Sequence, residues 1–584
     1  MVVFYYLKWF FIQEKKAYLT GITLLLFVAA LQLVPPRVIG IIVDLIQNQT
    51  LTGQTLALWM GLLLASGLGM YVLRYYWRIM IFGSAVKLAK QMREKLFIHF
   101  TQMSRQFYQN RRTGDLMAHA TNDLSAIQQT AGAGVLTLVD SLATGLFVIG
   151  AMAILIDWKL TLIALIPMPF MALSTSLYGR MLHKRFKYAQ EAFSDLNDKT
   201  QESISGIKVI KTFGQEKEDV ESFRQLSKSV VDKNIAVARV DSLFDPTITF
   251  IVGVSFFLSI YFGAQMVVAD EMTLGELVSF TTYLGLLVWP MLAFGWLFNI
   301  VERGRASYER VNILLSHPQE IKNEEGSTSN PPQGDIQLAL DSFTYGGTDK
   351  PTLKNIQFEL KRGQTLGIVG KTGAGKTTLL KLLMREEDQY TGFIGMGGKD
   401  IKTYDLHALR ESIGYVPQDH FLFSMSVKDN IRFAAPDVTE ELLEEAARIA
   451  RVHDDITGFT NGYETVVGER GVSLSGGQKQ RISIARALVT NPEVLILDDS
   501  LSAVDAKTEE DILTGLKEKR KGKTTIITAH RLSAVEHADL ILVLDQGELA
   551  ESGTHMELMG KSGLYYTMYM RQQLEDLVEK GGER

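Results

Sequence analysis

The chain has 584 residues, of which 46% are hydrophobic and 21% are charged, and its formal net charge is −5. This length exceeds that of one ordinary core and, with the high apolar content, predicts an apolar domain joined to a water-soluble one. The weak charge argues against a broad nucleic-acid-binding surface, and the absence of cysteine excludes disulfides, thiolate catalysis and cysteine metal sites.

Six long apolar stretches without a charged side chain dominate the first half of the chain. Such stretches are typical of helices that cross a hydrocarbon layer of about 30 Å. A buried core helix is the alternative for any one of them, but six in succession favour a membrane domain. The third is short by itself and is expected to begin near Ala131 and to include Asp140. The stretches are residues 17–36, 55–73, 141–156, 160–179, 246–269 and 277–301.

The connections between these stretches differ in their content of Lys and Arg. The second and fourth are long and rich in both residues, whereas residues 47–55 and 270–276 contain neither. Because basic residues accumulate in cytoplasmic loops, both termini and the two long connections are expected in the cytoplasm of a multi-pass cell (plasma) membrane protein. The first stretch is too long for a signal-peptide core and is expected to remain as a span. Pro35 and Pro36 are expected to kink it, since proline removes a backbone donor.

The composition changes after residue 316. Residues 317–335 are rich in Pro, Gly, Ser and charge and have no apolar period, which is typical of a linker. Beyond them, β-branched strands alternate with helical patterns, which predicts an α/β fold with a largely parallel sheet. We therefore expect a transmembrane domain of six helices with two long cytoplasmic loops at 1–316, a linker at 317–335 and an α/β domain at 336–584.

A glycine-rich motif in the second domain fits the phosphate-binding loop (P-loop) pattern G-x-x-x-x-G-K-[ST]. It follows an apolar strand and opens a helix that starts at Thr378, which we include among the ATP-binding residues. The N–H groups of the loop suit the phosphates of ATP; Lys376 would contact the β- and γ-phosphates, and the Thr377 hydroxyl would bind Mg²⁺. A chance match in a flexible loop is the alternative, which the strand and helix disfavour. The motif consists of Gly370, Lys371, Thr372, Gly373, Ala374, Gly375, Lys376 and Thr377.

Four apolar residues, 494–497, predict a strand that ends at Asp498. A carboxylate at a strand end beside a P-loop can hold Mg²⁺ through its water shell. The alternative is an ordinary acidic strand end, which is common in isolation but less expected beside a P-loop. The second domain is therefore predicted to bind ATP and Mg²⁺.

A further motif resembles the signature of ATP-binding-cassette (ABC) proteins and consists of Leu474, Ser475, Gly476, Gly477 and Gln478. The resemblance covers the whole chain, because six spans followed by one such domain is the layout of ABC exporter half-transporters. It implies an exporter-type membrane domain, an ABC nucleotide-binding domain, and ATP hydrolysis coupled to transmembrane transport. It also implies that two nucleotide-binding domains close head to tail, with each ATP between the P-loop of one chain and residues 475–478 of the other.

The resemblance assigns roles to further positions. Tyr345 lies where the family has an aromatic ring that stacks on adenine, and Gln418 where it has a glutamine that contacts Mg²⁺ and couples the domains. His530 matches the switch histidine that contacts the γ-phosphate, and residues 502–505 match a loop that communicates across the dimer. Each also has an ordinary alternative as a core tyrosine, a loop glutamine, a strand-end histidine or a helix cap. Their order and spacing favour the functional roles.

Asp499 occupies the position where the family normally has a catalytic glutamate. Its side chain is one methylene shorter, and a reacting group misplaced by about 1 Å can lose about 10²-fold in rate. The alternative is that the backbone adjusts and Asp499 serves as a working base. Because residues 475–478 are intact, the combination resembles one subunit of the heterodimeric bacterial multidrug exporters. It implies that the chain's own P-loop site is hydrolysis-impaired, while its signature completes a competent site on a partner chain.

The expected partners are a second ABC half-transporter, amphipathic small-molecule substrates and membrane lipids, with no nucleic acid. Multidrug efflux is the first interpretation. The alternatives are a lipid or lipopeptide flippase of the same fold and, from another class, an ATP-gated regulatory subunit that does not pump. Residues 112–116 and 206–216 resemble the short coupling helices of the family, with a solvated helical turn as the alternative.

Overall fold

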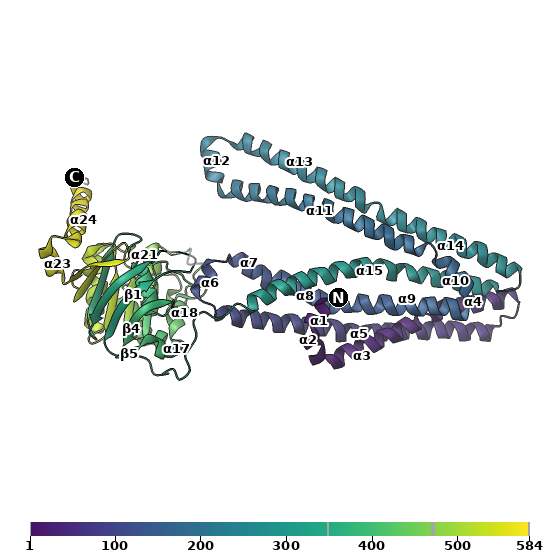
Figure 1. Cartoon of the computed structure of the whole chain (residues 1–584), viewed down its shortest axis with the longest axis horizontal. Helices are drawn as coiled ribbons and strands as arrows, with labels where there is room; N and C mark the ends of the chain where they lie inside the picture. Colours follow the sequence, from purple (N-terminus) through teal and green to yellow (C-terminus); the bar gives the residue numbers. More distant parts are fainter. Residues whose placement is uncertain (1, 347, 349, 469–473, 582–584) are drawn as a thin grey trace. The chain divides into compact units, whose positions relative to one another are not determined.

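The computed structural model describes residues 2–346, 348, 350–468 and 474–581. The chain divides into two compact units (Figure 1). We call Met1–Gln102 with Tyr108–His317 the helical unit, and Met103–Phe107 with Pro318–Arg584 the α/β unit.

Six helical stretches of the helical unit are long and apolar enough to cross a membrane: Lys15–Gln47, Gly53–Thr101, Thr113–Leu155, Trp158–Ser205, Glu216–Val268 and Leu274–Leu315. Four of them contain the predicted stretch, and the third and fifth end one residue before it does, so the predicted membrane fold is confirmed. The helices are α1 (Val2–Tyr6), α2 (Lys8–Gln13), α3 (Lys15–Leu31), α4 (Val34–Gln47), α5 (Gly53–Thr101), α7 (Thr113–Ala118), α8 (Leu124–Gln129), α9 (Val135–Leu155), α10 (Trp158–Leu165), α11 (Met168–Ser205), α12 (Ile207–Phe213), α13 (Glu216–Asp241), α14 (Phe244–Val268) and α15 (Leu274–Leu315).

Two of the six stretches are irregular in an informative way. The first is broken after Leu31, so that Pro35 and Pro36 fall in the first turn of α4. A proline fits there because its missing N–H would have no partner in the first turn. The helix is thus interrupted where the two prolines predicted an irregularity. The third runs from α7 to α9 through two five-residue π-helices, η1 (His119–Asp123) and η2 (Thr130–Gly134). The helix of the third span therefore starts well before residue 141, as expected.

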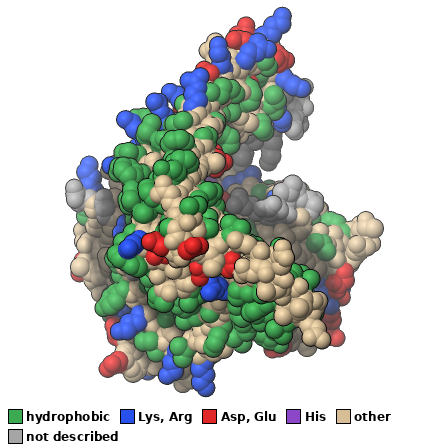
Figure 2. All heavy atoms as spheres, turned by 90° about the vertical axis from the view of Figure 1, so that its right-hand side faces the viewer, with side chains coloured by type: hydrophobic (Ala, Val, Ile, Leu, Met, Phe, Trp, Pro, Cys, Tyr) green, Lys and Arg blue, Asp and Glu red, His purple; other side chains and the backbone are tan. Residues whose placement is uncertain are grey.

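At the end of the helical unit that carries the short connections, α4 and α15 approach each other closely. A Cβ atom on Gly275 would lie 2.0 Å from the carbonyl oxygen of Gly40, so only glycine fits this contact. The Asp44 carboxylate accepts hydrogen bonds from the Gly275 N–H and the Thr273 hydroxyl, both at 2.7 Å. Asp44 therefore caps α15, where the helix dipole stabilises a negative charge. Figure 2 shows this end, where acidic side chains form a group within a largely hydrophobic surface.

The α/β unit is built on one 10-stranded sheet with the order β5-β4-β1-β2-β10-β9-β3-β8-β7-β6. From β9 to β6 all neighbouring strands are parallel, whereas β1 pairs antiparallel with β2 and β4. Strands and helices alternate along the parallel part, which confirms the predicted α/β fold. The strands are β1 (Ile336–Phe343), β2 (Leu353–Leu360), β3 (Thr365–Gly370), β4 (Tyr390–Met396), β5 (Lys399–Asp400), β6 (Ile413–Val416), β7 (Val494–Asp498), β8 (Thr524–Thr528), β9 (Leu540–Asp545) and β10 (Glu548–Gly553). The helices used below are α16 (Lys376–Leu383), α19 (Glu440–Ile449), α21 (Gly476–Leu488), α22 (Ala506–Lys519), the 3₁₀-helix η7 (Leu532–Val535) and α24 (Leu564–Gly581).

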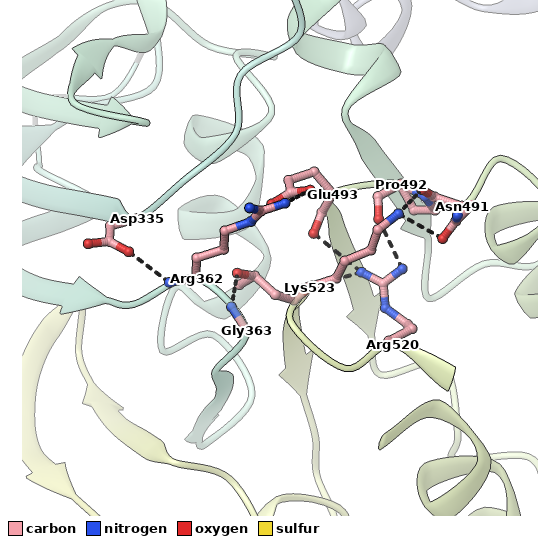
Figure 3. Close-up of polar contacts among 9 residues, drawn as sticks. Asp335, Arg362, Gly363, Asn491, Pro492, Glu493, Arg520 and Lys523 are labelled. Atoms are coloured by element: carbon pink, nitrogen blue, oxygen red, sulfur yellow. Dashed lines mark hydrogen bonds and ion pairs between the residues drawn. The ribbon is translucent and has the colours of Figure 1, made fainter. Parts of the chain in front are cut away.

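A polar cluster fastens the starts of three parallel strands, at the edge of the sheet opposite their carboxyl ends (Figure 3). Arg520, which is 6% exposed, donates to the carbonyl oxygens of Pro492 at 3.0 Å and Thr524 at 2.9 Å. Arg362 binds the Glu493 carboxylate through two of its nitrogens. Burial lowers the pKa of Arg520 to about 10, because it disfavours the charged form. Since these residues begin or directly precede β3, β7 and β8, the cluster holds the three strands together.

One short segment of the second connection packs with the α/β unit. Met103–Phe107 belongs to that unit, and Arg105 Nη1 lies 3.4 Å from Glu386 Oε2. The motif at 112–116, which resembles a coupling helix, lies in the helical unit in and just before α7. The segment that packs with the α/β unit therefore lies upstream of the motif.

Candidate nucleotide-binding site

The P-loop lies between β3 and α16, which are the strand and helix that the motif requires. Gly373 and Gly375 have φ values of 84° and 99°, a conformation that residues with a Cβ rarely adopt. A Cβ on Gly375 would also lie 2.4 Å from Leu353 Cδ2. The glycines thus let the loop lead directly into the positive end of the α16 dipole, an arrangement that suits phosphate.

Lys376 lies folded over the loop that carries it. It is 8% exposed, and its Nζ donates hydrogen bonds to the carbonyl oxygens of Gly370 at 2.8 Å and Lys371 at 3.3 Å. Burial lowers the pKa of Lys376, and the nearby carboxylates of Asp498 and Asp499 oppose this shift. The ammonium group is therefore held by neutral acceptors, which an anionic phosphate can replace with a stronger partner.

Asp498 ends β7 and accepts hydrogen bonds from three hydroxyl groups. The donors are Thr377 at 3.2 Å, Thr528 at 2.7 Å and Tyr415 at 3.2 Å. Thr528 is the register partner of Asp498 in the parallel pair of β7 and β8. One carboxylate beside a threonine hydroxyl is the kind of oxygen donor set with which proteins hold Mg²⁺ on nucleotide phosphates. The residues present therefore fit the predicted cation.

The three predicted catalytic residues, Asp499, Gln418 and His530, lie close together. Asp499 Oδ2 accepts a hydrogen bond from Gln418 Nε2 at 3.3 Å and lies 3.9 Å from His530 Nε2. Asp499 has a φ of 47°, which is uncommon for a residue with a Cβ. Its N–H donates to the carbonyl and hydroxyl oxygens of Thr528, both at 3.0 Å. The turn after β7 is therefore fixed by the neighbouring strand, and the Asp499 carboxylate remains directed to the other two residues.

Tyr345 packs against the first turn of α16. Its hydroxyl donates to the Thr378 hydroxyl at 3.3 Å and accepts a hydrogen bond from Lys381 Nζ at 3.4 Å. Its ring meets that of Phe343 edge-on, with the centroids 4.8 Å apart. Tyr345 and Thr378, both predicted to bind ATP, thus lie together just after the P-loop. The stacking of adenine on Tyr345 remains a prediction.

The signature segment begins α21 and is capped by its own side chains. Ser475 Oγ accepts a hydrogen bond from the Gln478 N–H at 3.2 Å, and Gln478 Oε1 accepts one from the Ser475 N–H at 3.1 Å. A Cβ on Gly477 would lie 3.0 Å from the Ala503 carbonyl oxygen, so this glycine permits close packing on residues 502–505. Among the described residues, no hydrogen bond joins the segment to the P-loop. The two predicted halves of an ATP site are therefore not joined by a hydrogen bond in the described part of one chain.

Two residues of the site were not predicted from the sequence. Thr528 and Tyr415 both donate to Asp498, from the ends of β8 and β6. Which strands lie beside β7 depends on the order of the sheet, which a local motif does not contain. The available signal was that polar residues at the carboxyl ends of parallel strands gather at one edge.

Comparisons with known proteins agree with this architecture. The family described as ABC transporter transmembrane region matches residues 18–291, and the ABC transporter family matches residues 353–502. The chain is 47% identical over 576 residues to the probable multidrug resistance ABC transporter ATP-binding/permease protein YheI of Bacillus subtilis (strain 168). This match covers 99% of this chain and 98% of that protein. It is 46% identical over 584 residues to the multidrug resistance-like ATP-binding protein MdlA of Escherichia coli (strain K12), and the match covers 100% of this chain and 99% of that protein.

A solved structure of a bacterial Atm1-family ABC exporter with ATP bound resembles the whole chain. The TM-score is 0.78 at 26% identity, and the match covers 96% of this chain and 98% of the other. The family matches and the relatives span both units. The chain therefore belongs to the ABC transporter family: it is a multi-pass membrane exporter that binds ATP and couples ATP hydrolysis to transport, homologous to multidrug ABC transporters.

Proposed function

We propose that the chain exports amphipathic small molecules across the cell membrane as one half of a heterodimer with a second ABC half-transporter. The names of the relatives, which describe multidrug resistance proteins, support the substrate class. The Lys- and Arg-rich long connections support cytoplasmic termini. A second half is supported by the absence of any hydrogen bond between the P-loop and residues 475–478 among the described residues of one chain, since the resemblance implies an ABC site built from both.

The observation that supports a partner of different sequence is the presence of Asp499 at the position where the family has glutamate. Its carboxylate reaches Gln418 and His530, so it stands at the position of the base, but it is one methylene shorter than glutamate. Because its N–H is tied to Thr528, the backbone has little freedom to move the carboxylate forward. A base that stands about 1 Å from its required position loses about 10²-fold in rate. The chain's own P-loop site is therefore the slow one.

In this slow site the chain's own residues bind and orient MgATP. The N–H groups of 370–377 and the Lys376 ammonium hold the β- and γ-phosphates. Thr377, Gln418 and Asp498 would hold Mg²⁺, which would neutralise phosphate charge when it is bound. Tyr345 would stack on the adenine.

The chain also contributes to the second, competent site. The N–H groups at the start of α21, in residues 475–478, bind the γ-phosphate of the ATP that lies on the partner's P-loop. The capping box of Ser475 and Gln478 keeps this helix start formed. The glutamate of that site comes from the partner chain, so this chain supplies only the signature side.

The ATPase activity of the purified chain in lipid nanodiscs tests this assignment. We expect slow turnover alone, and an increase of at least about 10-fold in Asp499→Glu, which supplies the missing methylene. Lys376→Ala in the same background is the control and is expected to abolish turnover, since it removes the phosphate contact. Fast turnover by the unaltered chain as a homodimer would contradict the heterodimer.

Efflux of a cationic dye from inverted vesicles that contain the chain and its partner tests the cargo. The proposal requires ATP-dependent dye transport that Lys376→Ala abolishes. Labelled-lipid flipping without dye transport would support the flippase instead, and nucleotide binding without either activity would support the regulatory subunit.

A further inference from the structure

The C-terminal helix α24 contacts the segment that carries His530. Gln572 Oε1 accepts a hydrogen bond from the Leu532 N–H at 2.9 Å, and Gln572 Nε2 donates one to the His530 carbonyl oxygen at 2.5 Å. One side-chain amide thus binds backbone groups on both sides of Arg531, much as a neighbouring strand would. The Leu532 N–H lies at the start of η7, where a helix has no internal partner for its first donors.

Helix α24 is itself fixed on the core of the α/β unit. Tyr565 is 0% exposed, and its hydroxyl shares a hydrogen bond of 2.8 Å with His555 Nδ1. Tyr569 lies one turn further, and the Glu536 carboxylate, hydrogen-bonded to its hydroxyl, raises the pKa of Tyr569. Tyr565, Tyr569 and Gln572 are spaced by four and three residues and therefore share one face of the helix. The amide of Gln572 is thus presented by an anchored element.

The side chain of Arg531 links the same segment to a second functional loop. Arg531 Nη1 donates to the Val504 carbonyl oxygen at 3.4 Å and lies 3.7 Å from the carboxylate of Glu509 on α22. Glu509 is 4% exposed, so this pair is largely shielded from water on its acidic side. The segment at 530–532 is therefore held by α24 through its backbone and by α22 through Arg531.

The His530 side chain itself is poorly fixed by packing. It is 41% exposed, and its Nε2 lies 3.9 Å from Asp499 Oδ2, beyond a normal hydrogen bond. Its position is therefore set mainly by the backbone that carries it. A shift of that backbone by about 1 Å would lower the rate of a reaction that depends on the His530 side chain.

We propose that Gln572 is a positioning residue of the nucleotide site, which fixes the His530 backbone and thereby the place of the imidazole beside Asp499. The inference rests on the proposed role of His530 at the γ-phosphate. In the described part of the chain the Gln572 side chain has no hydrogen bond to the P-loop, and it acts through the segment at 530–532. Helix α24 thus contributes to ATP hydrolysis by positioning His530.

A double-mutant cycle on the full-length chain in nanodiscs tests the proposal, in the Asp499→Glu background so that the chain's own site turns over. Gln572→Ala is expected to lower kcat about 10-fold, while KM for ATP changes less than about twofold. His530→Ala is expected to lower kcat further, and adding Gln572→Ala to it is expected to cost nothing more, because Gln572 acts through His530. Gln572→Glu keeps only the acceptor for Leu532 and is expected to lie between Gln572→Ala and the parent.

Gln573→Ala is the matched control. This neighbouring glutamine lies on the same helix, but its amide donates to the Tyr569 hydroxyl at 3.3 Å instead. We expect it to leave kcat and the melting temperature unchanged. Equal losses by Gln572→Ala with and without His530 would show a merely structural role and overturn the proposal.

Hydrogen exchange at the Leu532 amide, measured with ATP and Mg²⁺ by mass spectrometry, keeps the test independent of turnover. Gln572→Ala is expected to speed this exchange at least about 10-fold, because the amide loses its acceptor, and Gln573→Ala is not. Unchanged exchange overturns the inference. A loss of kcat in His530→Ala but not in Gln572→Ala overturns the inference alone, whereas no loss in His530→Ala overturns the proposed role of His530 as well.

Discussion

At the scale of single residues, Asp498 shows how a carboxylate is fixed at the end of β7. Thr528 is the most buried of its three hydroxyl donors, with 1% exposure, and also binds the N–H of Asp499. One threonine on β8 therefore fixes both acidic residues at the end of β7. The buried network is fully satisfied at this point, which makes it sensitive to the loss of any member.

Thr528→Val keeps the shape of the side chain and removes its hydroxyl. We expect a loss of about 1–2 kcal/mol in the stability of the α/β unit, since Asp498 loses a buried donor, and weaker binding of MgATP. Hydrogen exchange of β7 amides and equilibrium nucleotide binding measure the two effects. Thr403→Val is the control, because the Thr403 hydroxyl is exposed and donates only to the Asp400 carbonyl. Equal effects of the two substitutions would contradict the assignment.

The residues that could be predicted from the sequence are those that lie within one continuous motif. The P-loop and residues 475–478 each place glycines at the start of a helix. Because these residues are neighbours in the chain, the motif can be recognised from the sequence alone. Thr528, Tyr415 and Gln572 act on residues that are far away in sequence. Their roles follow from strand order and from the docking of α24, which no local pattern contains.

At the scale of elements, the predicted number of spans is correct because each must be long and uncharged to cross a membrane. The apolar stretches cover only part of each helix: α5 extends to Thr101 and α11 to Ser205, well beyond the apolar residues. Helix can continue into water as long as packing supports it, and α11 packs along α13. Hydropathy therefore marks the membrane-crossing part of a helix and not the helix itself.

The contact between α4 and α15 gives a prediction for Gly275→Ala. The added methyl group would lie 2.0 Å from the Gly40 carbonyl oxygen and 2.6 Å from Asp44 Oδ1, so the helices must separate. We expect a loss of about 1–3 kcal/mol in stability, as for other overpacked contacts. Thermal unfolding followed by tryptophan emission reports on this unit, since all 6 tryptophans lie in it.

Gly61→Ala provides the matched control for Gly275→Ala. Gly61 lies in α5, and a Cβ there would have no neighbour within 4 Å. Alanine also favours a helix over glycine by up to about 1 kcal/mol, so stability is expected to stay the same or rise slightly. A Gly275→Ala variant as stable as Gly61→Ala would show that the two helices are not in close contact.

The polar cluster in Figure 3 gives a second prediction at this scale. Arg520→Met keeps much of the apolar stem but leaves buried carbonyl oxygens without donors, and we expect a loss of about 2–4 kcal/mol. Hydrogen exchange of β7 and β8 amides measures this loss. Arg448→Met on α19 is the control, because Arg448 is 60% exposed and pairs only along its own helix with Glu444. Its expected effect is below about 0.5 kcal/mol.

At the scale of the whole molecule, the separation of the P-loop from residues 475–478 predicts complementation between damaged chains. In the Asp499→Glu background, Lys376→Ala and Ser475→Arg are each expected to be inactive as homodimers. Chains of the two kinds mixed before assembly can form one site with an intact P-loop and an intact signature. The mixture is therefore expected to regain part of the ATPase activity. A mixture as inactive as its components would show that ATP is not shared between chains.

The fastening of three strands at one edge of the sheet has a mechanical consequence. Arg520 and Arg362 hold the starts of β3, β7 and β8 together, whereas the predicted nucleotide-binding residues lie at the opposite ends of these strands. A tightly packed interior is nearly incompressible and passes strain on instead of absorbing it. We therefore expect a displacement at the carboxyl ends of these strands to be passed on to the loops that follow them, and a weakened polar cluster to let the sheet absorb part of it.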